Sequence, residues 1–135
     1  MKSLITILFL FSALYLSAQT KTVFNIGHGS GLIGGVTFLN PIEGANMAYG
    51  FQYVQRNNRQ FVQSSLGASF GNNIMTFTTA AFVGTEIKKN PNDELNHVGL
   101  SMTIRCNVFK GIGLETKYEQ SKTSNFYFSL TYQLN

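Results

Sequence analysis

The stretch from residue 97 to residue 107 decides how this chain folds, and it reads His97-Val98-Gly99-Leu100-Ser101-Met102-Thr103-Ile104-Arg105-Cys106-Asn107. Its even-numbered positions are all apolar, and its odd-numbered positions are all polar or glycine. A period of two is the pattern of a β-strand that has one apolar and one polar face. The stretch is also about as long as a tilted β-strand that crosses a bilayer.

Seven further runs show strand character, and turn-forming residues separate them. The predicted strands are Lys21–His28, Leu32–Leu39, Asn46–Gln55, Gln60–Phe70, Ile74–Ile87, His97–Asn107, Ile112–Gln120 and Phe126–Asn135. The faces of Leu32–Leu39 are ambiguous, and Phe82 interrupts the alternation of its strand. We expect a turn over Asn40–Ala45 and the longest and most charged loop over Lys88–Leu95. The pattern predicts an all-β fold, an eight-stranded antiparallel up-and-down barrel that spans a membrane.

The beginning of the chain indicates secretion. A short basic start precedes an apolar run from Leu4 to Leu16, and the small residues Ser17 and Ala18 follow it. This build is typical of a signal peptide and is too short for a membrane span. We therefore predict that residues 1–18 are a signal peptide and that residues 19–135 are a single barrel domain. The alternative is a retained amphipathic anchor.

The composition narrows the class of protein. Charged residues make up 12% of the chain, about half of the roughly 25% that is usual in soluble domains. Aromatic residues are plentiful at 13%, and the net charge of +4 is not gathered in any run, so the sequence predicts no nucleic-acid partner. Cys106 is the only cysteine, which excludes an intrachain disulfide and a cysteine-based zinc site.

The polar faces of the predicted strands indicate which side looks inward. They consist mostly of small or amide residues, which suit the crowded lumen of an eight-stranded barrel. The ionisable residues assigned to these faces are Glu86, His97, Arg105, Glu115, Lys117 and Glu119. A lysine or arginine that faced lipid at mid-depth would cost about 2–4 kcal/mol. We therefore predict a structural charge network inside the lumen; the alternative is a set of solvated charges on a soluble barrel.

Four tyrosines lie on the apolar faces near predicted strand ends: Tyr49, Tyr53, Tyr118 and Tyr132. Membrane barrels carry aromatic girdles at such positions, where the protein crosses the lipid–water interface. The alternative is that tyrosine is present simply because it favours strands.

In these features the chain resembles the small outer-membrane barrels of the OmpA and OmpX type. The last strand, Phe126–Asn135, is similar to the terminal signal that barrel assembly machinery reads, although it ends in Leu134-Asn135 rather than phenylalanine. The Ser-Ala-Gln ending of the leader is similar to that of Bacteroidetes secreted proteins. The resemblance implies a monomer in the outer membrane with both termini in the periplasm. The basic loops would then contact lipopolysaccharide phosphates, or they are merely solvated tips.

A catalytic centre is not predicted. His97 and Ser101 share a strand face but lie roughly 13 Å apart, and two histidines alone leave a metal without its remaining ligands. We expect no enzyme activity, no cofactor and no metal. The sequence predicts a small structural outer-membrane barrel with short loops and no open pore, and it leaves a surface-binding role open. The alternative is a soluble secreted barrel that binds an apolar ligand, as lipocalins do.

Overall fold

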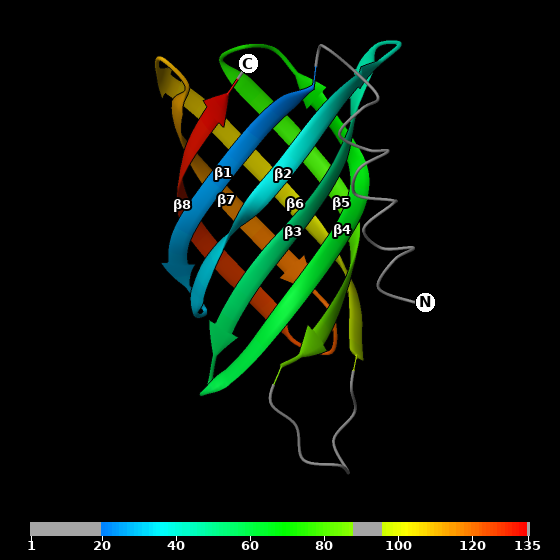
Figure 1. Cartoon of the computed structure of the whole chain (residues 1–135), viewed down its shortest axis with the longest axis vertical. Coiled ribbons are helices and arrows are strands. Elements are labelled where there is room, and N and C mark those ends of the chain that lie inside the picture. The colour runs from blue at the N-terminus through cyan, green and yellow to red at the C-terminus, as the bar shows by residue number, and fades with distance from the viewer. Residues whose placement is uncertain (1–19, 88–95, 135) are drawn as a thin grey trace, which may run out of the picture.

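The computed structural model describes residues 20–87 and 96–134 and shows one closed β-barrel. Its strands are β1 (Lys21–Gly29), β2 (Leu32–Ile42), β3 (Ala45–Arg56), β4 (Arg59–Gly71), β5 (Met75–Glu86), β6 (Asn96–Phe109), β7 (Ile112–Gln120) and β8 (Ser124–Leu134). Each strand pairs antiparallel with the next, and β8 closes on β1 (Figure 1). The predicted all-β, eight-stranded antiparallel barrel is confirmed. The predicted signal peptide and the loop Lys88–Leu95 lie outside the described residues.

The two ends of the barrel differ in what they carry. The loop end has the turns between β1 and β2, β3 and β4, and β7 and β8. The terminal end has the start of β1, the finish of β8 and the other three turns, and it is uppermost in Figure 1. Within the two described ranges, no helix is long and apolar enough to cross a bilayer.

Most hairpins close with very short turns. Asn57 and Asn58 have φ angles of 51° and 60°, the left-handed conformation that two-residue hairpin turns require. The turn expected over Asn40–Ala45 is present but shorter, because β2 continues to Ile42 and β3 begins at Ala45, which leaves two residues in the turn. Pro41 lies beyond the last described pair of β1 with β2, Lys21 with Leu39, and proline is tolerated in a strand where its missing N–H is not needed for pairing.

The alternation along each strand sorts side chains between the two sides of the wall. In β6, Leu100 is 63% exposed on the outside, whereas Ser101 is buried in the lumen. The ambiguous β2 follows the same rule, with Ile33 buried inside. Phe82 is also buried inside, because Gly99 lies opposite it and leaves room for the ring; a Cβ on Gly99 would come within 2.7 Å of that ring.

Charge is confined to one side of the wall. Across the strands that the structure describes, every lysine, arginine and glutamate occupies a position of inward parity: Lys21, Arg56, Arg59, Glu86, Arg105, Glu115, Lys117 and Glu119. The outward positions carry the large exposed apolar side chains, such as Ile26, Leu66 and Phe128. The exterior of the barrel is therefore an uncharged apolar band.

Candidate functional site: the lumen and its mouth

Strands β6 and β7 supply the charges at the centre of the lumen. Arg105 on β6 lies directly opposite Glu115 on β7. Its Nη2 and Nε atoms donate to Glu115 Oε2 at 2.7 and 3.1 Å, and both side chains are almost fully buried. From β1, two strands away around the barrel, Asn25 Nδ2 donates to the other oxygen of Glu115 at 3.1 Å. Both oxygens of this buried carboxylate are thus held by donors, as burial of a charge requires.

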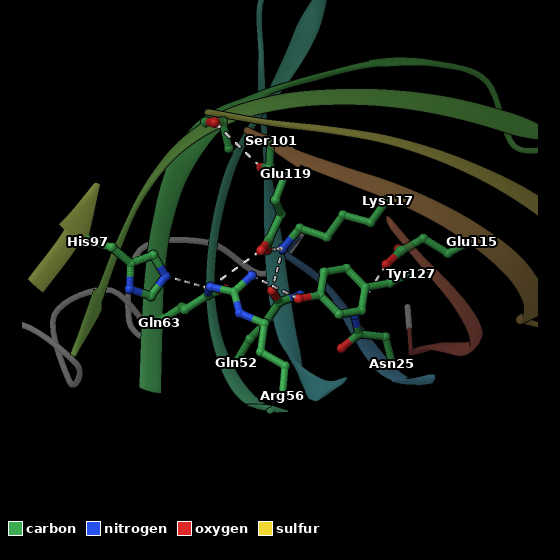
Figure 2. Close-up of polar contacts among 11 residues, drawn as sticks. Asn25, Gln52, Arg56, Gln63, His97, Ser101, Glu115, Lys117, Glu119 and Tyr127 are labelled. Carbon is green, nitrogen blue, oxygen red and sulfur yellow. Dashed lines mark hydrogen bonds and ion pairs between the residues drawn. The ribbon is translucent and has the colours of Figure 1, made fainter. Parts of the chain in front are cut away.

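A second buried ion pair follows on β7. Lys117 Nζ lies 2.8 Å from Glu119 Oε1, and it also donates to Gln52 Oε1 on β3. Figure 2 shows Glu119, Lys117 and Gln52 converging inside the barrel. Together with the first pair, two cations face two carboxylates, so the centre of the lumen is electrically neutral.

His97 extends this network toward the loop end. Its Nε2 atom lies 3.2 Å from the side-chain nitrogen of Gln63, which also donates to Glu119 Oε2 at 3.5 Å (Figure 2). The imidazole packs edge-on against Phe61 and Phe82, with ring centroids 5.0 and 5.6 Å apart. His97 is therefore joined to Glu119 through the Gln63 amide.

Glu86 occupies a different place from the other predicted network residues. It lies at the loop end, where Arg59 holds its carboxylate with two hydrogen bonds of 3.0 and 2.5 Å. The Arg59 side chain is 51% exposed, so this is a pair at the rim. The structure brings together the remaining predicted residues at the centre: His97, Arg105, Glu115, Lys117 and Glu119.

The sequence did not single out the three amides that complete the network, Asn25, Gln52 and Gln63. All three have inward parity on their strands, and this alternation is the sequence signal that could have assigned them to the lumen. Their partners lie 90, 65 and 56 residues away along the chain, on strands that are not their neighbours in the sheet. Pairs this distant follow from closure of the barrel rather than from any local spacing.

The mouth of the lumen at the loop end is covered by two arginines. The guanidinium carbons of Arg56 and Arg59 each lie 5.4 Å from the ring centroid of Phe61. Arg56 Nη1 also donates to the hydroxyl of Tyr127 at 3.4 Å (Figure 2). The sequence places both arginines on one of the basic loops, which would contact lipopolysaccharide phosphates or be solvated tips, and that prediction stays untested. In the structure both side chains contact Phe61, whose inward parity they share.

Apolar clusters lie toward both ends of the polar centre. The loop-end cluster consists of Ile33, Val54, Phe61 and Tyr127, and the terminal-end cluster consists of Val23, Leu39 and Ala48. Between them is a cavity of about 20 Å³, lined among others by Ser65, Thr78 and Arg105. That volume accommodates about one water molecule. Over residues 20–87 and 96–134, no group of histidine, cysteine or acidic residues is arranged to hold a metal ion.

Comparison with known proteins shows the fold alone. No protein-family model and no curated protein matches the chain. A solved structure described as "De novo design of transmembrane beta-barrels" is similar, with a TM-score of 0.64 and 11% sequence identity over 85% of this chain and 94% of that chain. The likeness supports a small eight-stranded barrel. It does not extend to the OmpA and OmpX families or to Bacteroidetes, so that resemblance stays a prediction.

Proposed function

We propose that this protein is a small structural β-barrel of the outer membrane with a closed lumen. The supporting observation is the uncharged exterior: in the described strands all charged residues have inward parity, while apolar side chains face out. A lysine or arginine exposed to lipid at mid-depth costs about 2–4 kcal/mol, and here none is placed there. A soluble barrel would instead carry its charges outside and its apolar residues inside.

The filling of the lumen supports a barrel that does not conduct. Eight strands enclose only enough space for their own side chains. Here the two ion pairs fill the centre, and an apolar cluster lies toward each end. The central cavity of about 20 Å³ is also far below the roughly 300 Å³ at which small-molecule pockets begin. This lumen therefore offers no support for a lipocalin-like apolar ligand site.

Two tyrosines have the geometry expected at a membrane interface. At the loop end, the Tyr118 hydroxyl donates to Ser124 Oγ at 3.2 Å. At the terminal end, the Tyr49 hydroxyl accepts a hydrogen bond from Asn40 at 3.4 Å. Both rings have outward parity, so each presents an apolar body to the wall and a polar tip to neighbouring groups.

The finer parts of the proposal rest on the sequence. The predicted signal peptide and the C-terminal strand favour secretion followed by assembly into the outer membrane by barrel assembly machinery. The proposed partners are therefore outer-membrane lipid, including lipopolysaccharide, and that machinery. We propose a monomer without enzymatic activity, cofactor or nucleic-acid partner.

Fractionation and reconstitution test this proposal. The full chain should sediment with membranes, require detergent for extraction, and float with liposomes after refolding. In planar bilayers it should give no stepwise conductance, because the lumen is filled. Recovery of a folded barrel from the soluble fraction without detergent would contradict the membrane assignment. Discrete conductance steps would contradict the closed lumen.

A further inference from the structure

The outward face of the wall ends in polar groups at the loop end. The last outward side chains of six strands there are uncharged and capable of hydrogen bonding, and we call them the collar: His28, Gln55, Gln60, Thr85, Gln120 and Ser124. They come from β1, β3, β4, β5, β7 and β8, so the collar surrounds most of the barrel. Among the described residues at this level, two exposed apolar side chains interrupt the collar: Leu32 on β2, and Ile87, which follows β5 and whose backbone N–H donates to the carbonyl of Gln60.

The terminal end is built differently. Apolar side chains reach the last outward positions there, and Ile42, Val108 and Phe109 are each more than half exposed. Lys110, in the adjacent turn, places its Nζ atom 5.2 Å from the centre of the Phe109 ring. A lysine that extends past an apolar side chain in this way is typical of the boundary between lipid and water. At this end apolar side chains occupy the last outward position of most strands, whereas at the loop end polar side chains occupy most of them.

The collar residues form neighbouring pairs along the rim. Gln55 and Gln60 are cross-strand partners on β3 and β4, and Gln120 and Ser124 are partners on β7 and β8. Ser124 Oγ donates to Gln120 Oε1 at 2.7 Å. Side-chain amides and hydroxyls offer both donors and acceptors. The Gln120 amide also contacts Tyr118 and Ser121, so the Gln55 and Gln60 pair carries most of the hydrogen-bonding capacity that the argument needs.

The chemistry of the collar discriminates between kinds of headgroup. Phosphate recognition uses arginine and lysine, but the arginines of the β3–β4 hairpin, Arg56 and Arg59, lean over Phe61 inside the mouth. The described cation beyond the collar is Lys122, in the β7–β8 turn. Within the described strands, the outward positions at headgroup level carry no lysine, arginine or carboxylate, and their side chains complement groups that donate and accept hydrogen bonds without charge.

We propose that the collar binds the uncharged, hydroxyl-rich headgroups of glycolipids at the loop end of the barrel. This inference rests on the proposed membrane function, because the collar meets headgroups only if the apolar band lies in a bilayer. The headgroup sugars would hydrogen-bond the paired amides and hydroxyls.

The binding of glycolipid headgroups by the collar can be tested by measuring which lipids the protein retains. The refolded protein is placed in phosphatidylcholine vesicles that contain equal fractions of digalactosyl diacylglycerol and phosphatidylglycerol, and the lipids that remain bound are identified by native mass spectrometry. We expect about fivefold enrichment of the galactolipid, the ratio that one net hydrogen bond provides. Because no charge is involved, the enrichment should persist at high salt.

Two variants separate the collar from the rest of the wall. Replacing Gln55, Gln60 and Gln120 together by leucine should abolish the enrichment. The matched control, Ser64→Leu with Thr79→Leu, makes the same kind of outward change away from the rim and should retain it. Equal binding of both lipids, a preference for phosphatidylglycerol that salt removes, or enrichment that survives in the collar variant would overturn the inference. Failure of the protein to insert into the vesicles would overturn the membrane function itself.

Discussion

The two faces of strand β7 carry opposite chemistries on one backbone. Its outward residues are Ile112, Leu114, Thr116 and Tyr118, and its inward residues are Gly113, Glu115, Lys117 and Glu119. In a soluble barrel the charged face would meet the solvent. Here the charged side chains lie inside, each next to a charge of opposite sign. Because the side-chain period is two, a slip of one residue would place three charges in the apolar band, so the register of this strand is strongly specified.

The largest effect should come from breaking a buried pair on the inner face. Replacing Arg105 by leucine leaves Glu115 buried without its guanidinium, and we expect the free energy of unfolding in micelles to fall by about 3–5 kcal/mol. Urea titration followed by circular dichroism measures this. The double variant Arg105→Leu with Glu115→Leu removes both charges and should recover most of the loss. An Arg105→Leu variant of undiminished stability would show that the interior does not depend on pairing.

A charge added to the outer face should lower the free energy of unfolding somewhat less than the loss of Arg105. Leu130 lies near the middle of β8 and faces outward, so Leu130→Arg should lower the free energy of unfolding in a bilayer by about 2–4 kcal/mol. Leu134 lies at the end of the same strand, and Leu134→Arg should cost only about 0–1 kcal/mol. Equal effects at the two positions would contradict an apolar band that is deepest at mid-strand.

The smallest effect on stability should come from adding a methyl group to a glycine, and it should differ between the inner and the outer face. A Cβ on Gly84 would lie 2.2 Å from the ring of His97 inside the lumen, so Gly84→Ala should destabilise the barrel by about 1–3 kcal/mol through overpacking. Gly34 faces outward, and a Cβ there would meet nothing closer than 3.7 Å. We expect Gly34→Ala to change the free energy of unfolding by less than about 0.5 kcal/mol. The same denaturation assay compares the two variants.

The fold could be predicted from the sequence because alternation is a local signal. It located the strands and separated the faces of β6 and β7 without any knowledge of pairing. The inward position of Phe82 could not be found in this way, because it depends on Gly99 being its cross-strand partner. That register is set by how β5 and β6 meet across a long connection, which the pattern of either strand alone does not fix.

Some of the contacts inside the lumen could also be predicted from the sequence, and others could not. Parity alone assigned Arg105 and Glu115 to the lumen, whereas their direct pairing depends on the register shift between Asn107 and Phe109 beside the turn. The contact of Lys117 with Gln52 depends on barrel curvature, which brings β7 and β3 within reach across the lumen. The placement of Glu86 beside Arg59 depends on height within the barrel, which parity does not report.

Both buried ion pairs form within the β6–β7 hairpin, so their charges can be neutralised before the other strands of the barrel are in place. Arg105 with Glu115, and Lys117 with Glu119, need only β6 and β7 in register. The hairpin therefore supplies the counter-ion of each charge that it buries in the lumen, and the net charge of these four buried groups is zero. Only neutral amides, those of Asn25, Gln52 and Gln63, remain to be supplied by strands that arrive separately.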